Sequence, residues 1–126
     1  MNTIIFNLSY LVAYFKVINI HDLTTTKKFF LLLHRLKQNN IAAPSVGFDV
    51  EYVEPKIELY WWFKENYISI SHWEENKFTW LFAPNSLDMD DIKIESWDSS
   101  YCIIHDELLN ILLTNLGIES YAYKNN

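Results

Sequence analysis

Hydrophobic and polar positions alternate most regularly between Ile57 and Phe82, in the stretch IELYWWFKENYISISHWEENKFTWLF. Three short apolar and aromatic runs repeat with a period of two, and polar clusters at residues 64–66 and 74–77 separate them. Alternation of this kind is typical of strands, and short polar connections join neighbouring strands as hairpins. The stretch is therefore predicted to form a three-stranded antiparallel meander.

The alternation gives the predicted meander two different faces. The first face is apolar and is expected to be buried; it carries Ile57, Leu59, Trp61, Phe63, Ile68, Ile70, Phe78, Trp80 and Phe82. The second face is mixed and carries Glu58, Tyr60, Trp62, Lys64, Ser69 and Ser71. One face of an antiparallel sheet often stays in contact with water, and the mixed face is the candidate for it.

Residues 4–18 fit both a helical stripe and a strand-like alternation, and their length favours a helix. The apolar stripe of that helix consists of Ile4, Ile5, Leu8, Leu11, Val12, Phe15 and Ile18. We expect this stripe to face the core. A membrane anchor is the alternative, which the polar interruptions at Asn7, Ser9 and Lys16 disfavour.

Two further helices and two further strands are predicted. One helix spans residues 24–38, with a threonine run to cap its start and Asn39-Asn40 at its end, and another spans about 104–116 and ends at Gly117. Residues 47–54 are predicted to be a strand, and residues 92–94 a short edge strand.

These elements predict an α+β fold in a single domain over residues 1–126. A four-stranded antiparallel meander, five-stranded if residues 92–94 join it, is expected to pack on two N-terminal helices and one C-terminal helix. Half of the residues are hydrophobic, which is enough for one core in a chain of this length. Residues 118–126 are polar and are expected to be a frayed tail.

The net charge of −6 is unevenly distributed. Residues 1–44 carry five Lys or Arg and one Asp, whereas residues 45–110 carry four Lys and fourteen Asp or Glu. An acidic surface repels phosphate backbones, so nucleic acid is not an expected partner, and it suits a basic protein. Cys102 is the one cysteine, so no internal disulfide can form, and a reducing cytoplasm is the simplest compartment. No signal-peptide pattern precedes Lys16.

Candidate catalytic and metal-binding residues are sparse. The two His-Asp dipeptides, His21-Asp22 and His105-Asp106, lack the further ligands of a metal site and are interpreted as surface or capping residues. The acidic run at residues 88–91 lacks the glycine and the closing glutamate of a calcium loop. The sequence therefore predicts neither an enzyme nor a bound metal or cofactor.

The aromatic residues assigned to the second face have two interpretations. Tyr52, Tyr60, Trp62, Tyr67 and Trp73 stand among Glu51, Glu58 and Glu74. If a helix covers the face, they belong to the core. If the face is open, they form a protein-binding surface, because Tyr and Trp are favoured anchors at interfaces and carboxylates complement Lys and Arg. The binding residues predicted on the second interpretation are Glu51, Glu58, Tyr60, Trp62, Trp73 and Glu74.

The block IAAPSVGFDVEYVEPKIELYWWFKENYISISHWEENKFTWLFAP, residues 41–84, resembles small bacterial proteins in which a proline-containing turn leads into a meander of this form. It is similar to immunity proteins that neutralise contact-dependent inhibition toxins or related polymorphic toxins. The resemblance implies a cytoplasmic bacterial protein that binds one cognate toxin domain, often a basic nuclease. The alternatives are a small enzyme or ligand-binding domain with a pocket between helices and sheet, and a phage-encoded inhibitor or accessory protein.

Overall fold

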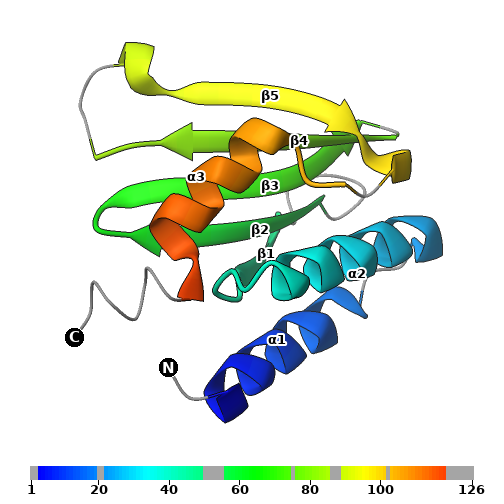
Figure 1. Ribbon diagram of the computed structural model, residues 1–126. Helices are drawn as coiled ribbons and strands as arrows, with labels where there is room; N and C mark the ends of the chain where they lie inside the picture. The colour runs from blue at the N-terminus through cyan, green and yellow to red at the C-terminus, as the bar shows by residue number, and fades with distance from the viewer. Residues whose placement is uncertain are drawn as a thin grey trace. The chain divides into compact units, whose positions relative to one another are not determined.

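The computed structural model describes residues 3–19, 22–49, 56–74, 76–85, 89–101 and 103–118 (Figure 1). The chain forms two compact units, and each is described by itself. A helical unit comprises Met1–Pro44 and Cys102–Asn126, and a sheet unit comprises Ser45–Tyr101. The predicted tail beyond residue 118 and the predicted strand residues 50–54 lie outside the described residues.

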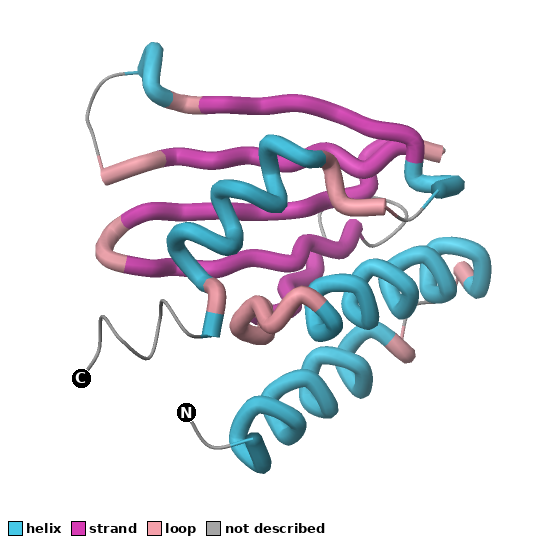
Figure 2. The backbone as a smooth tube through the Cα atoms, viewed as in Figure 1, coloured by secondary structure: helices cyan, strands magenta, loops and turns pink. Residues whose placement is uncertain are grey.

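The helical unit contains α1 (Thr3–Val17), α2 (Leu23–Gln38) and α3 (Asp106–Leu116). The sheet unit contains β1 (Ser45–Asp49), β2 (Lys56–Phe63), β3 (Asn66–Glu74), β4 (Lys77–Ala83) and β5 (Lys93–Asp98), with the short 3-10 helices η1 (Met89–Asp91) and η2 (Ser99–Tyr101). Helices and strands occupy separate stretches of the chain (Figure 2). The predicted α+β class is confirmed.

The sheet is an antiparallel meander in the order β1-β2-β3-β4-β5. In the register, Trp61 stands opposite Ile68, and Ile70 stands opposite Trp80, so the apolar positions of the three central strands share one face. The three predicted central strands are confirmed. The strand predicted at residues 47–54 begins earlier, at Ser45, and the short edge strand predicted at residues 92–94 is the longer β5.

The apolar face of the sheet is buried almost throughout. Ile57, Leu59, Trp61, Phe63, Ile68, Ile70, Phe78 and Trp80 are buried, and Phe82 is partly exposed. The strict alternation ends at a bulge in β3, where the register shifts between Ser71 and Glu74. There His72 and Trp73 stand against the single residue Phe78 of β4. The alternation that assigns Trp73 to the second face therefore does not extend to that residue.

The β2–β3 hairpin turns through Lys64 and Glu65, which both have positive φ, of 50° and 67°. The closing pair is Phe63 and Asn66, so the loop has two residues with the geometry of a type I′ turn. This turn matches the twist of the strands, but a left-handed conformation costs a residue other than glycine or asparagine about 1 kcal/mol. The polar cluster predicted the position of the turn, and its residues are not those that the turn favours.

Within the helical unit, α1 packs on α2 through an aromatic contact, and a buried hydrogen bond joins α1 to the segment that follows α2. The rings of Tyr14 and Phe30 lie 5.2 Å apart, and the Tyr10 hydroxyl donates to the carbonyl of Ile41 at 2.7 Å. The start of α2 is capped by Asp22, whose carboxylate accepts from the Thr24 amide at 2.9 Å. The prediction that the threonine run provides the cap is therefore wrong, because Asp22 precedes it and reaches the free amides.

Backbone hydrogen bonds join the segment that follows α2, residues 40–42, to the end of α3, residues 116–118. The amide of Ala42 donates to Leu116 at 2.8 Å, and the amide of Ile118 donates to Asn40 at 2.7 Å. Asn40 has a φ of 57°, which ends α2 as predicted. Gly117 ends α3 as predicted, for a different reason. Its φ is −61°, and a Cβ there would lie 2.6 Å from the carbonyl oxygen of Leu113.

The predicted helix at residues 4–18 is confirmed as α1, but the prediction that its stripe faces the core is wrong. The α1 stripe, defined as Ile4, Ile5, Leu8, Leu11, Val12, Phe15 and Ile18, is between 48% and 66% exposed. The buried residues of α1 are Tyr10, Ala13 and Val17, on the opposite side of the helix. No helix in the described ranges is long and apolar enough to cross a lipid bilayer.

Candidate protein-binding surface

Four side chains on the second face of the sheet form the aromatic cluster: Glu58, Tyr60 and Trp62 of β2 and Tyr67 of β3. The rings of Trp62 and Tyr67 are 4.7 Å apart between centroids, and those of Tyr60 and Tyr67 are 6.2 Å apart. The Tyr67 hydroxyl donates a hydrogen bond to Oε1 of Glu58. Tyr67 is thus the centre of the cluster, in contact with the other three residues.

The backbone of the sheet explains why these four residues meet. Trp62 and Tyr67 are direct cross-strand partners beside the two-residue turn, and Tyr60 and Glu58 follow at intervals of two along β2. On the other side of β2, Gly47 of β1 leaves room for the Tyr60 ring, since a Cβ at Gly47 would lie 3.2 Å from Cε1 of Tyr60. A glycine in an edge strand that is covered by an aromatic ring is a known packing arrangement.

The electrostatics of the cluster keep Tyr67 protonated. Burial raises the pKa of the Tyr67 phenol above its ordinary value of 10.0, and the hydrogen bond to Glu58 raises this pKa further. The phenol therefore remains a hydrogen-bond donor at neutral pH. Its bond to Oε1 holds the Glu58 carboxylate in one orientation within the cluster.

The second face is open to solvent at several points. Trp62 is 67% exposed and Ile94 of β5 is 60% exposed, whereas the small side chains of Ser69 and Ser71 are buried in the centre of the face. The alternative in which these aromatics belong to the core is therefore wrong for Trp62. An indole that is mostly in water and held by a neighbouring ring is the kind of side chain that anchors protein interfaces.

The structure brings together three of the six predicted binding residues, Glu58, Tyr60 and Trp62. Glu51 lies outside the described residues, and only the backbone of Trp73 and Glu74 is described, at the end of β3 beyond the bulge. Tyr67 belongs to the site although it is absent from the predicted set. The signal that could have found it is the length of the turn, because a two-residue turn at residues 64–65 makes positions 62 and 67 cross-strand neighbours.

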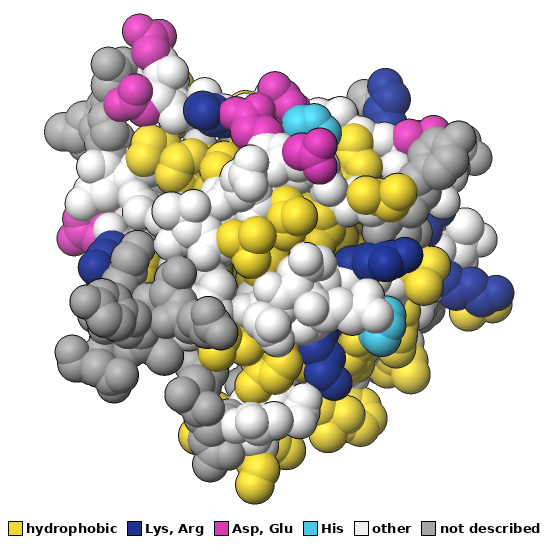
Figure 3. All heavy atoms as spheres, in the orientation of Figure 1, with side chains coloured by type: hydrophobic (Ala, Val, Ile, Leu, Met, Phe, Trp, Pro, Cys, Tyr) yellow, Lys and Arg dark blue, Asp and Glu magenta, His cyan; other side chains and the backbone are white. Residues whose placement is uncertain are grey.

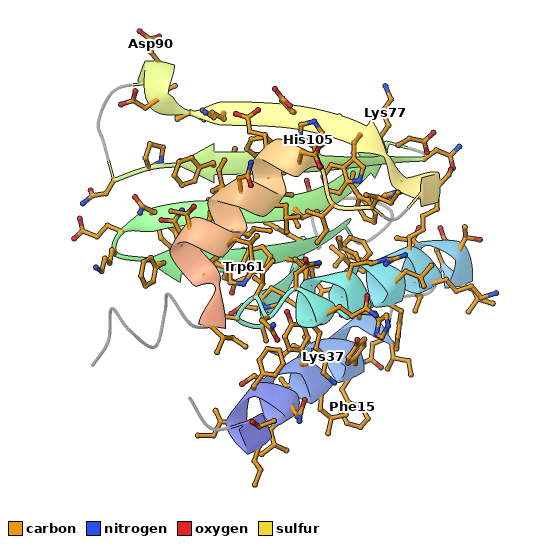
Figure 4. All side chains as sticks on the ribbon, in the orientation of Figure 1. Phe15, Lys37, Trp61, Lys77, Asp90 and His105 are labelled. Carbon is orange, nitrogen blue, oxygen red and sulfur yellow. The ribbon has the colours of Figure 1, made fainter. Side chains whose placement is uncertain are left out.

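The sheet unit as a whole is acidic. Its sequence holds twelve Asp or Glu and four Lys, a net charge of −8. Asp90 and Asp91 of η1 and Glu95 and Asp98 of β5 are exposed, and acidic side chains gather over these two elements in Figure 3. Figure 4 shows Asp90 projecting from the β4–β5 edge of the unit. Charges of this density attract basic partners over distances of about 10 Å at moderate salt.

A serine and a histidine also meet in the sheet unit, away from the aromatic cluster. Nε2 of His72 lies 3.2 Å from Oγ of Ser99, and the imidazole packs edge-on against Phe78. Such a distance suits a base and a nucleophile, but the Ser99 side chain is 0% exposed, so no substrate atom can reach its hydroxyl. The contact is therefore a partly buried polar link between β3 and η2.

The His-Asp dipeptides do not assemble a site in the described part of the chain. Asp22 caps α2, as predicted for a capping residue, and His21 lies outside the described residues. His105 precedes α3, and Asp106 is exposed in the first turn of that helix. Among the described residues, no three His, Cys, Asp or Glu side chains are grouped so that they could hold a metal ion.

The fold and this surface define the chain as an α+β protein with an acidic sheet unit, whose second face carries an aromatic cluster with an exposed tryptophan. Comparisons with protein-family models, curated proteins and solved structures found no match for it. The similarity to immunity proteins therefore stays a prediction from the sequence.

Proposed function

We propose that this chain is a cytoplasmic bacterial immunity protein, which neutralises a cognate toxin domain by binding it and covering its active site. The observation that carries the proposal is the exposed Trp62, held against Tyr67, which also binds the Glu58 carboxylate, in a unit of net charge −8. Inhibition by occlusion needs a firm contact and no chemistry, and an anchored aromatic residue with a nearby carboxylate provides such a contact.

The expected partner is a basic toxin domain, such as a nuclease. A nuclease must attract phosphates, so its substrate-binding surface carries Lys and Arg. The acidic sheet unit would steer such a surface into contact, and the Glu58 carboxylate, oriented by Tyr67, would then pair with one of its cations. Trp62 would supply the desolvated centre of the interface.

The experiment has two stages, because the partner has first to be identified. The tagged chain is used to capture proteins from its native host, and mass spectrometry identifies the captured toxin. Binding of that toxin is then measured by stopped-flow fluorescence across a salt series. We expect association to be fastest at low salt, and the purified chain to suppress the toxin's activity at a one-to-one ratio.

Two substitutions separate steering from anchoring. Glu58→Lys should slow association, and Trp62→Ala should leave association nearly unchanged while dissociation becomes about 30-fold faster. The matched control is Glu95→Lys, which makes the same charge change in β5, away from the aromatic cluster. It should slow association less than Glu58→Lys. If the association rate does not change with salt or with Glu58→Lys, and the dissociation rate does not change with Trp62→Ala, the second face is not the binding surface.

A further inference from the structure

The helical unit carries an apolar surface that the proposed toxin contact does not use. The α1 stripe lies on the side of α1 opposite the buried Tyr10, Ala13 and Val17, so this helix is apolar on two opposite sides. One side packs within the unit and the other faces water. A soluble helix normally has one apolar side, which packs on its own core, so a second apolar side indicates that another surface covers the stripe.

The spacing within the stripe is that of a helix-pairing seam. Its central residues, Ile4, Leu8, Leu11, Phe15 and Ile18, follow one another at intervals of four, three, four and three. This is the a/d repeat of a coiled coil, with Ile5 and Val12 widening one flank. Hydrophobic side chains gather over α1 in Figure 3, and Figure 4 shows Phe15 pointing outward, away from α2.

The area of the stripe matches what a stable dimer needs. At roughly 100 Å² of exposed area for each half-exposed side chain, seven side chains present about 700 Å², more than the largest apolar patch of most monomers. An ordinary interface buries about 800 Å² on each partner. The stripe itself contains no charged residue, so two copies could meet along it without burying an ion.

From this spacing, area and lack of charge we propose that the protein is a homodimer in which the α1 stripes of two copies pair in antiparallel orientation. A two-fold axis at Leu11 sets Leu11 against its own copy, Leu8 against Phe15 of the second copy and Ile4 against Ile18 of the second copy. The antiparallel orientation also separates the two copies of Lys16 and opposes the helix dipoles. The inference does not depend on the proposed toxin contact, which uses the sheet unit.

A lipid surface is the other partner that an apolar helix face fits, and the borders of the stripe disfavour it. Helices that lie in a membrane interface are rich in Lys and Arg beside the apolar face. Within α1, the exposed residues that border the stripe are Asn7 on one side and Ser9 and Lys16 on the other, which gives this helix one cation, and the other Lys and Arg side chains that the structure describes in this unit belong to α2. This composition suits a protein interface better than an anionic membrane.

Sedimentation equilibrium of the full chain tests the proposal across a series from about 1 µM to about 200 µM, which brackets micromolar dissociation constants. We expect a monomer–dimer equilibrium that Leu11→Glu weakens by about 30-fold or more, because it places two carboxylates at the two-fold axis. The control Ile94→Glu changes an apolar residue of the sheet unit that is also about half exposed, and it should leave dimerisation unchanged. Circular dichroism checks that both variants are folded.

Cysteine cross-linking tests the orientation in a Cys102→Ser background. Ile4→Cys and Ile18→Cys should each cross-link poorly alone, and an oxidised mixture of the two should yield the mixed dimer. Efficient cross-linking of each variant with itself would overturn the antiparallel arrangement. The dimer would be overturned by a wild-type chain that stays monomeric at the highest concentration. It would also be overturned if the wild-type chain floats with phosphatidylserine vesicles and Leu11→Glu abolishes that flotation.

Discussion

Two adjacent tryptophans test the register on which the candidate surface depends. Trp61 and Trp62 are neighbours in β2, yet Trp61 is 5% exposed on the buried face and Trp62 is 67% exposed on the second face. Trp61→Ala and Trp62→Ala remove the same atoms from the same strand. The difference between their unfolding free energies therefore measures which face each position occupies.

The two substitutions differ in what each side chain touches. Removing the buried Trp61 side chain loses the free energy gained by burying it away from water, and it leaves a cavity opposite Ile68. The unfolding free energy should fall by about 3–5 kcal/mol. Removing Trp62 forfeits mainly the ring contact with Tyr67, worth about 0.5–1.5 kcal/mol. With a urea slope of about 1.5 kcal/mol/M, the midpoint falls by about 2–3 M for Trp61→Ala and by about 1 M or less for Trp62→Ala.

Urea unfolding followed by far-ultraviolet circular dichroism is the assay, because tryptophan fluorescence would itself change with the substitutions. A domain of ordinary stability, about 5–15 kcal/mol, leaves room to measure both losses. Equal midpoints for the two variants would refute the assigned faces. A larger loss for Trp62→Ala would indicate a register slipped by one residue, since such a slip exchanges the two faces.

Two further predictions concern the turn and the buried phenols. Replacing Lys64-Glu65 by Asn-Gly should stabilise the fold by about 1 kcal/mol or more, because both positions have positive φ; a lower urea midpoint would contradict the type I′ geometry. Burial raises the pKa of Tyr10 and of Tyr67, the latter also through Glu58, whereas the unfolded chain ionises near 10.0. The unfolded state then binds fewer protons, so the unfolding free energy should fall as the pH rises past about 10, and Tyr67→Phe should reduce that fall. The unfolding free energy of Tyr67→Phe and of the unchanged chain is measured by urea melts at a series of pH values between about 9 and 11.5. An equal fall with pH in both proteins would show that Tyr67 ionises normally.

The sequence by itself determined the elements of this protein, because their signals are local. Alternation with a period of two specifies strands, and polar clusters specify the turns between them, so the meander from β2 to β4 follows from residues 57–82 alone. The same reasoning placed Glu58, Tyr60 and Trp62 on one face. These assignments hold because consecutive side chains of a strand must point to opposite sides of the sheet.

Tertiary structure decided everything that alternation leaves undetermined. The bulge at His72 and Trp73 breaks the pattern of two without any mark in the local sequence, and the hydrogen bond from Tyr67 to Glu58 joins residues nine positions apart. The clearest case is α1, where apolar residues line both sides of the helix. Periodicity can then show that a helix forms, but only packing against the rest of its unit selects the side of Tyr10 for burial and leaves the side of Leu8 exposed.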